Sequence, residues 1–422
     1  MKDRLLHTPE GVRDIYNVEC ARKSVLENKL KNKLRLYGYE EIRTPSFEFF
    51  EIFNTERGTV RAKEMYKFFD REGNTLVLRP DITPSIARAV SKYYGDEVLP
   101  MRFFYLGNIF RNNSSYQGRL KEMTQLGAEF IGSHQPSADA EVIAMAVDLL
   151  LEAGLENFQI DIGQVAFFKS LVREAGIDKD TEETIRLLIE NKNYFGIETL
   201  VETLPISAEI RQILIKLPQW FGGIEMLRQA KKMTSQLKAR EALVSLEKIY
   251  ELLCGYGFEK YISFDLGMLS EYHYYTGTIF KGYTYGTGDT ILKGGRYDSL
   301  IGQFGKDAAS TGFAIEVDRL LTALSRQNIS IPLHADAMLI LYNEGYIQTA
   351  IELAALLRSR GQAAALLTFS EKRSVADYMQ YCRQHQMYTI CRLYDDIQVE
   401  LIDVFTGQTE KMLIKDMEEG RL

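Results

Sequence analysis

The spacing of the strand-like segments is the feature that most restricts what this chain can fold into. Predicted helices over Glu19–Leu36, Pro84–Tyr94 and Ala138–Leu151 fall among these segments but do not separate them one by one. That arrangement disfavours a doubly wound parallel sheet, in which strands and helices alternate. It predicts an α+β fold whose mostly antiparallel sheet is flanked by helices. The expected strands are Thr75–Leu78, Arg102–Tyr105, Thr124–Ile131, Ile262–Asp265, Tyr275–Phe280 and Thr290–Leu292.

The pattern changes twice along the chain. Residues from about 167 to 254 are nearly all helical in pattern and predict a helical insertion, and a helix over Gly312–Leu324 is expected to close the core. After the polar stretch Ser325–Leu333, strand and helix patterns alternate, which predicts a small α/β domain. The sequence therefore predicts a core over residues 1–325 and a C-terminal α/β domain over residues 335–422.

Composition argues against several classes of protein. The 422 residues carry a net charge of −7, which disfavours a protein whose main task is to grip a phosphate backbone. No apolar run is long enough to cross a bilayer, and the first ten residues lack the apolar centre of a signal peptide. The four cysteines form no Cys-x-x-Cys pair, and no phosphate-loop motif supports an unrelated nucleotide-binding enzyme. We expect a cytoplasmic protein with no metal site and no membrane segment.

Four stretches carry more specific information, although each is a weak signal alone. In chain order they are Leu78–Thr83, Phe110–Asn113 followed by Gly118–Glu129, Tyr274–Phe280 followed by Gly294–Asp298, and Gly312–Leu320. Together they resemble the core of the histidyl-tRNA synthetases. The pairing of Tyr-Tyr-Thr-Gly with Gly-Gly-Arg-Tyr-Asp is specific to that type among class II aminoacyl-tRNA synthetases.

The resemblance has consequences for the architecture. It implies a class II aminoacyl-tRNA synthetase-like antiparallel sheet, with the C-terminal domain in the place of an anticodon-binding domain. Class II cores pair through their first motif, which Glu41–Phe50 matches loosely. The resemblance therefore also implies at least a homodimer.

Several residues of the motifs have side chains that suit the groups of a histidine ligand. Its ammonium needs carboxylates or neutral acceptors, and each ring nitrogen needs a partner. Asp81, Thr83 and Gln125 suit the ammonium, whereas Glu129 and Tyr275 suit the two ring nitrogens. Gln125 and Glu129 are four residues apart, and on a strand this even spacing directs both side chains to one face.

The resemblance to the synthetases assigns these same five positions to histidine. It adds Tyr297 to the same pocket. The synthetases usually carry glutamate where this chain has Asp81, so a shorter side chain makes that contact here.

The departures from the synthetase pattern fall on the adenylation half. Ser270 stands where the synthetases have an arginine that faces the reacting carboxylate and α-phosphate, and loss of such a donor typically costs roughly 10²–10³ in rate. Asn113 replaces an acid that reads adenine, and Glu316 replaces a glycine beside the nucleotide, where a carboxylate would repel phosphates. Arg111 and Arg319 persist as a remnant anion or nucleotide site. We therefore expect no catalytic residues and no cofactor.

This division resembles the regulatory subunits of ATP phosphoribosyltransferase, which are synthetase-like proteins that have lost aminoacylation. The resemblance implies a non-catalytic partner of the short-form catalytic subunit in the first step of histidine biosynthesis. L-histidine would be the feedback effector, and the chain would form a homodimer within a hetero-oligomer. The loop between Tyr105 and Met123, rich in Asn, Ser and Gly, is expected to order when the ligand binds.

Two alternatives stay open from the sequence. One is a working histidyl-tRNA synthetase with divergent motifs. The other is a synthetase-like sensor that acts through a different partner. We do not expect tRNA as a partner, because the C-terminal arginines and lysines fit a solvated face better than an RNA-binding patch.

Overall fold

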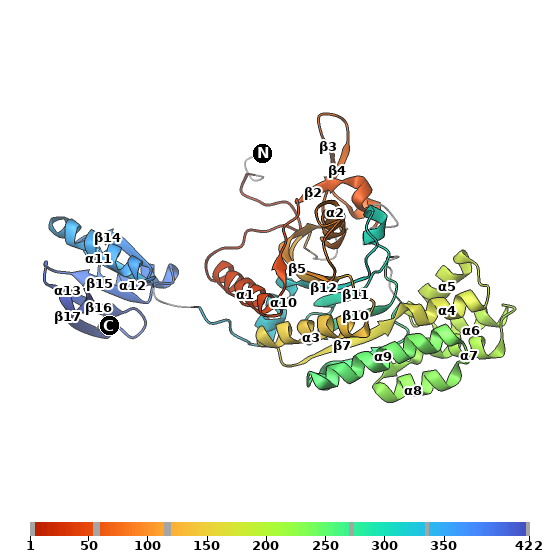
Figure 1. The fold of residues 1–422 in the computed structure, drawn as a ribbon. Helices are drawn as coiled ribbons and strands as arrows, with labels where there is room; N and C mark the ends of the chain where they lie inside the picture. Colours follow the sequence, from red (N-terminus) through yellow and green to blue (C-terminus); the bar gives the residue numbers. More distant parts are fainter. Residues whose placement is uncertain (1–4, 54–59, 114–119, 270–273, 334–336, 419–422) are drawn as a thin grey trace. The chain divides into compact units, whose positions relative to one another are not determined.

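A nine-stranded sheet organises most of the first 330 residues of the structure, a computed structural model that describes residues 5–53, 60–113, 120–269, 274–333 and 337–418 (Figure 1). The strand order is β1-β5-β6-β12-β11-β10-β7-β9-β8. Only the pairs β1–β5 and β7–β9 are parallel. The sheet confirms the predicted α+β fold with a mostly antiparallel sheet. Its strands are β1 (Glu40–Glu41), β5 (Met101–Phe110), β6 (Glu122–Ile131), β7 (Phe158–Gln164), β8 (Phe221–Gly222), β9 (Ile262–Asp265), β10 (Thr278–Thr284), β11 (Leu292–Arg296) and β12 (Ser310–Glu316).

Contacts between Cα atoms divide the chain into two units. One comprises Met1–Asp14 and Leu26–Ser330, and the other comprises Ile15–Val25 and Ile331–Leu422. Among the residues that the structure describes, no helix combines the length and the apolar character needed to span a bilayer.

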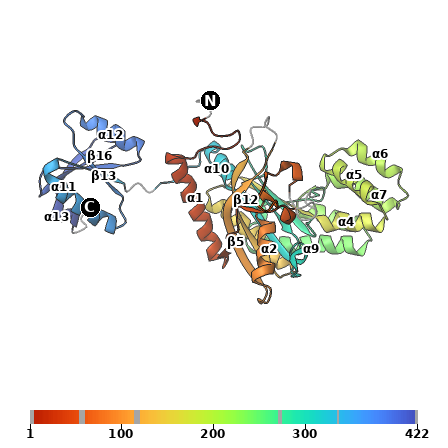
Figure 2. The same cartoon turned by 90° about the horizontal axis from the view of Figure 1, so that it is seen from above.

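Helices cover the sheet because their apolar residues recur with the helical period. In α1 (Asn17–Leu36), Leu26, Leu30 and Leu34 form one buried stripe, and the part of the helix from Leu26 onward lies beside β5, near the edge strand β1 (Figure 2). Helix α3 (Pro136–Glu152) is buried along most of its length and packs against β6, β11 and β12. The last helix of this unit, α10 (Val317–Arg326), packs against β6 and β12.

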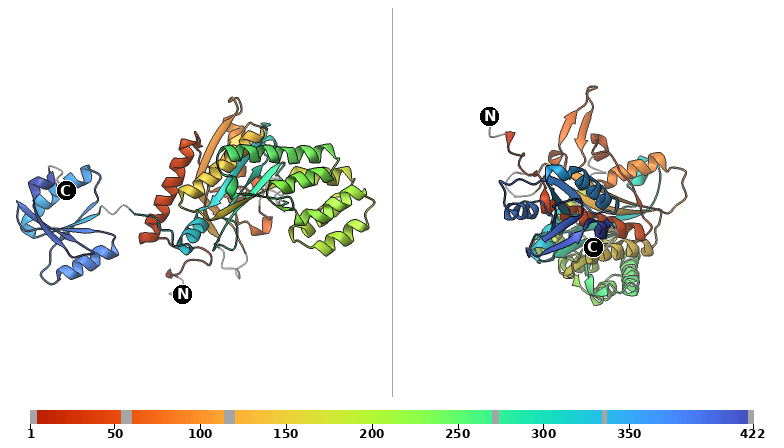
Figure 3. Two further views of the ribbon diagram at one scale, coloured as in Figure 1. Left: turned by 90° about the horizontal axis from the view of Figure 1, so that it is seen from below. Right: turned by 90° about the vertical axis from the view of Figure 1, so that its left-hand side faces the viewer.

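The segment predicted to be a helical insertion is helical apart from the short strand β8. Side chains of Asp178 and Ser207 accept hydrogen bonds from backbone N–H groups at the starts of α5 and α7, which satisfies donors that a helix leaves unpaired. Figure 3 shows most of these helices gathered beyond one end of the sheet, whereas α9 packs against α3 and β7. The helices of this segment are α4 (Val165–Glu174), α5 (Lys179–Glu190), α6 (Tyr194–Glu202), α7 (Ala208–Lys216), α8 (Ile224–Met233) and α9 (Leu237–Gly255).

Three of the expected elements have wrong boundaries. The helix predicted over Gly312–Leu324 is a strand up to Glu316, because β12 is buried between β6 and β11, and a short buried strand carries no alternating pattern. Strand β10 begins at Thr278 rather than Tyr275. Strand β11 extends to Arg296, through two glycines that lower strand propensity.

Two smaller sheets complete the structure. Strands β2 (Phe47–Phe49), β4 (Thr75–Leu78) and β3 (Lys67–Phe69) form an antiparallel sheet. Near the C-terminus, α11 (Ile347–Ser359) and α13 (Ile414–Glu418) cover one face of a five-stranded sheet and α12 (Val375–Gln384) covers the other (Figure 2). In order its strands are β14 (Ala364–Thr368), β13 (Met338–Tyr342), β15 (Thr389–Leu393), β16 (Gln398–Asp403) and β17 (Thr409–Leu413).

Candidate functional site

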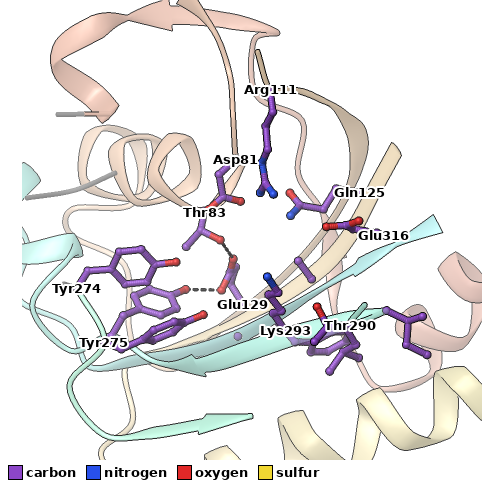
Figure 4. Close-up of a pocket in the computed structure, with 16 residues that line it drawn as sticks. Asp81, Thr83, Arg111, Gln125, Glu129, Tyr274, Tyr275, Thr290, Lys293 and Glu316 are labelled. Carbon is purple, nitrogen blue, oxygen red and sulfur yellow. Dashed lines mark hydrogen bonds between the residues drawn. The ribbon is translucent and has the colours of Figure 1, made fainter. Parts of the chain in front are cut away.

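A pocket of about 540 Å³ lies on the large sheet, between β6, β11, β12 and the start of α2 (Thr83–Tyr93) (Figure 4). The structure brings all six residues predicted to bind histidine into its wall. They are Asp81, Thr83, Gln125, Glu129, Tyr275 and Tyr297.

Glu129 is the most deeply buried ionisable residue of this wall, with a side chain only 1% exposed. The Thr83 hydroxyl donates to one carboxylate oxygen at 2.6 Å, and the Tyr297 hydroxyl donates to the other. Burial raises the pKa of Glu129 to about 8, although these two hydrogen bonds lower the pKa, and the nearby Asp81 charge raises it. The empty pocket therefore keeps a proton on Glu129 at neutral pH.

Glycines of two motifs leave the space that the pocket residues occupy. Gly312 lies opposite Glu129 in the β6–β12 pair, and a Cβ atom at Gly312 would overlap the Glu129 carboxylate. A Cβ atom at Gly295 would lie 2.7 Å from the Tyr275 ring. These glycines are required for close approach of side chains rather than for an unusual backbone angle.

One corner of the pocket is rich in hydrogen-bond acceptors. Gln125 is 5% exposed, and its Oε1 atom has no hydrogen-bond partner among the described residues. Asp81 lines the same pocket just before α2, where its Oδ1 atom accepts from the Ile82 backbone N–H at 2.8 Å. The Arg111 guanidinium lies between Asp81 and Gln125 (Figure 4). A buried acceptor without a partner costs about 1–3 kcal/mol, so this corner favours a ligand with N–H groups.

Three tyrosines form the opposite wall, and Tyr274 is one that the sequence did not single out. Its ring centroid lies 4.7 Å from that of Tyr275 and 5.9 Å from that of Tyr297. The Lys169 ammonium donates to the Tyr275 carbonyl at 3.0 Å, and so links the helical insertion to this wall. The Tyr-Tyr pair of the motif was the signal that could have identified Tyr274.

Arg296 anchors the segment that carries Tyr297. Its guanidinium forms a buried ion pair with Asp139 at 3.0 Å and donates to the Ser133 carbonyl at 2.7 Å. Its own carbonyl accepts from the Thr276 backbone N–H at 2.9 Å. Arg296 therefore ties the two tyrosine-bearing segments to the start of α3.

Two cations reach the pocket from its open side. Arg111, at the end of β5, and Lys293, in β11, both line it (Figure 4). Burial lowers the pKa of the Lys293 ammonium, and the Arg111 charge lowers this pKa further. The sequence did not single out Lys293, because a lysine in a strand is most often solvated. Together the two cations can hold a carboxylate.

A second, larger cavity adjoins the pocket and shares Arg111, Lys293 and Glu316 with it. It includes Asn113, which departs from the synthetase pattern, and Arg319, which retains it. Arg319 pairs with Glu316 at 2.7 Å and with Asp289 at 3.2 Å, and it donates to the Thr290 carbonyl. The Arg319 charge is thus already compensated within the chain, and its role as an anion site stays a prediction.

Some expectations concern residues outside those that the structure describes. Ser270 is one, and residues 114–119 of the loop expected to order on ligand binding are others. Within the described ranges, no three His, Cys, Asp or Glu side chains gather where they could hold a metal ion.

The known proteins that this chain resembles agree with the geometry of the pocket. Residues 11–320 match the family model described as histidyl-tRNA synthetase. The ATP phosphoribosyltransferase regulatory subunit of Acetivibrio thermocellus is 39% identical over 417 residues, which is 99% of either chain. The protein of the same description from Clostridium acetobutylicum is 39% identical over 420 residues, 98% of either chain.

Solved structures share the fold. One described as an ATP phosphoribosyltransferase regulatory subunit/histidyl-tRNA synthetase from Bacillus halodurans C is similar with a TM-score of 0.80 and 32% identity, over 89% of this chain and 96% of that chain. Histidyl-tRNA synthetase from Nostoc sp. PCC 7120 has a TM-score of 0.81 and 19% identity over 99% of both chains. At that identity only the fold is shared, and it confirms the predicted synthetase-like architecture.

Proposed function

The chain belongs to the histidyl-tRNA synthetase family and, within it, to the ATP phosphoribosyltransferase regulatory subunits, and on this premise we propose that it binds L-histidine in the pocket around Glu129 and regulates a short-form catalytic subunit. The chain itself is non-catalytic. It acts in the cytoplasm, in the first step of histidine biosynthesis, where histidine binding reports the level of the end product.

The pocket around Glu129 supports histidine because it offers a partner for each group of the amino acid. The acceptors of Asp81 and Gln125 suit the ammonium, and Arg111 with Lys293 suits the carboxylate. The observation that carries the proposal is the buried Glu129 carboxyl at the base of the pocket, which has hydroxyl partners but no cation among the described residues. A basic ring supplies what this carboxyl lacks.

The neighbouring cavity opposes adenylation. A triphosphate placed there would meet the Glu316 carboxylate and would compete with Glu316 and Asp289 for Arg319. This ion-pair arrangement supports a chain that senses an amino acid without activating it.

Regulation requires that histidine bind two arrangements of the complex with different affinities. A coupling free energy of about 1–3 kcal/mol between the histidine site and the catalytic subunit is typical. We propose a homodimer within a hetero-oligomer. We propose further that residues 335–422, the anticodon-binding-like domain of a chain that no longer serves tRNA, contribute contacts to the dimer or to the catalytic subunit.

The test is the steady-state rate of a short-form ATP phosphoribosyltransferase with and without this chain, each with and without histidine. The chain should raise the rate, and histidine should lower the raised rate. The Gln125→Leu variant should still activate but should need roughly 10- to 100-fold more histidine to inhibit, since one ammonium partner is lost. Gln398→Leu, at an exposed position in β16, is the matched control.

A histidyl-tRNA synthetase with divergent motifs is the competing function. The family match and the retained Arg111 favour it. Histidine-dependent exchange of pyrophosphate into ATP, together with no effect on the transferase, would establish that alternative and end the proposal.

A further inference from the structure

Among the described residues, the groups that bind the Glu129 carboxyl or act on its charge are acids and hydroxyls, and Arg111 and Lys293 line the same pocket. Asp81 faces the carboxyl from the segment before α2, and Thr83 and Tyr297 bind its two oxygens. From β12, Gly312, which has no side chain, lies opposite Glu129, and the Glu316 carboxylate lines the same pocket. Tyr39, Tyr105, Asp81 and Tyr297 are titratable groups that interact electrostatically with Glu129, and Tyr275 lies in the same pocket. Each of these becomes negative when it ionises.

The cations of the pocket do not offset this acidity. Within the part of the chain that the structure describes, no ion pair joins Glu129 to Arg111 or Lys293, the two cations that line the pocket. Arg296, next to Tyr297 in the chain, is bound to Asp139 and Asp298. A carboxylate that is fully buried without a positive partner is unstable, so the proton stays on Glu129 when the pocket is empty. The pKa of about 8 for Glu129 agrees with this geometry.

Resting on the proposed function, we propose that Glu129 stores the proton that converts a neutral ligand ring into a cation on binding, so that the pocket selects a basic ring over a non-basic ring of the same shape. The proton leaves the carboxyl oxygen of Glu129, and the lone pair of the facing ring nitrogen forms the new N–H bond. No proton passes to solvent. The resulting carboxylate accepts three hydrogen bonds, from Thr83, from Tyr297 and from the ring.

Binding reverses the effect of Asp81. In the empty pocket its charge disfavours ionised Glu129, whereas in the complex the same charge stabilises the ring cation. A charge-assisted hydrogen bond then replaces a neutral one, and it is roughly twice as strong. The 1,2,4-triazole analogue of histidine, whose ring is not basic, cannot accept the proton and should bind about ten-fold more weakly.

The pH dependence of affinity follows from the two proton carriers. Below about pH 6.5 the free ring is already a cation, so binding expels the Glu129 proton and affinity rises with pH, by at most about ten-fold per pH unit. Between that value and the Glu129 pKa of about 8 the pair exchanges no net proton, and affinity is level. At higher pH the empty pocket has lost the proton, so binding takes one up and affinity falls.

The direct measurement is nitrogen NMR of ring-labelled ¹⁵N histidine bound to the full-length chain at pH 7.5. Two protonated ring nitrogens are expected in the wild type, and one unprotonated nitrogen in Glu129→Gln. One unprotonated nitrogen in the wild-type complex would overturn the inference while leaving histidine binding intact. No binding of histidine at all would instead remove the proposed function on which the inference rests.

Calorimetric titrations from pH 5.5 to 9.5 supply a second test. In wild type the level region should end near pH 8, and Tyr297→Phe, which removes a hydrogen bond to the ionised carboxylate, should extend it to higher pH. This variant covers the case in which Glu129→Gln fails to fold. A level region that ends at the same pH in both proteins would show that Glu129 is not the proton carrier.

Discussion

Gly312 lies directly across the β6–β12 strand pair from Glu129, and its missing side chain is the space that the Glu129 carboxylate fills. Two motifs separated by more than half of the core thus depend on one contact. The glycine of the fourth motif and the acid of the second act as a unit, because either is of little use to the pocket without the other.

Replacing Gly312 tests that unit. Gly312→Ala should lower the free energy of unfolding by about 1–3 kcal/mol, because the added Cβ atom overpacks the sheet. It should also abolish measurable histidine binding. Thermal unfolding with and without histidine checks both effects. Gly345→Ala is the control, since a Cβ atom at Gly345 meets open space. Equal histidine-induced stabilisation of Gly312→Ala and wild type would contradict the assignment.

The stability of the ligand-free protein should depend on the proton held by Glu129. Its pKa rises from an ordinary value of 4.5 in an exposed carboxyl to about 8 in the fold, mainly through burial. The folded state therefore binds the extra proton, and stability is lost as pH rises from about 4.5 to 8, by at most about 1.4 kcal/mol per pH unit. Urea unfolding should be measured for wild type and Glu129→Gln between pH 5 and 8. As pH rises, the free energy of unfolding of wild type should fall relative to that of Glu129→Gln. Parallel pH profiles would refute it.

We expect the ion pair of Arg296 to stabilise the fold around the tyrosine wall. Arg296→Met leaves the Asp139 carboxylate buried without its cation and should cost about 3–5 kcal/mol of unfolding free energy. The double variant Arg296→Met with Asp139→Leu should recover much of that loss, because both charges are gone. Urea unfolding of the two single variants and the double variant measures the coupling. If the losses of unfolding free energy in the two single variants add up to the loss in the double variant, the ion pair contributes no coupling free energy.

Glu316 should be what excludes a nucleotide from the larger cavity. Glu316→Gly removes one of the two carboxylates that hold Arg319 and leaves room beside the backbone. ATP affinity should rise about ten-fold, since one like charge is removed close to the phosphates. Titration calorimetry with ATP checks this, with Glu344→Gln, an exposed residue of the C-terminal unit, as the control. Unchanged ATP affinity in Glu316→Gly would show that Glu316 does not exclude the nucleotide. The arginine lost at Ser270 would then be the residue to restore.

The identity of the pocket residues was predictable from sequence because their chemistry and order are local properties. Asp81, Thr83, Gln125, Glu129 and Tyr275 could be named from residue type and order, and Tyr297 from the resemblance to the synthetases. The spacing of Gln125 and Glu129 placed both on one strand face, and β6 has them there. The helical character of the insertion followed in the same way from periodicity within short windows.

What the tertiary structure decided depends on contacts between distant segments. Whether Gly312–Glu316 forms a strand or a helix is settled by pairing with β6 and β11, which no local window contains. The same pairing shows why Gly312 is a glycine, and it brings Lys293 to the pocket. Tyr274 reaches the pocket because the Thr276 backbone N–H binds the Arg296 carbonyl. The protonation of Glu129 also belongs to the fold, because only burial among acidic neighbours raises the pKa of a carboxyl that is ordinary in the sequence.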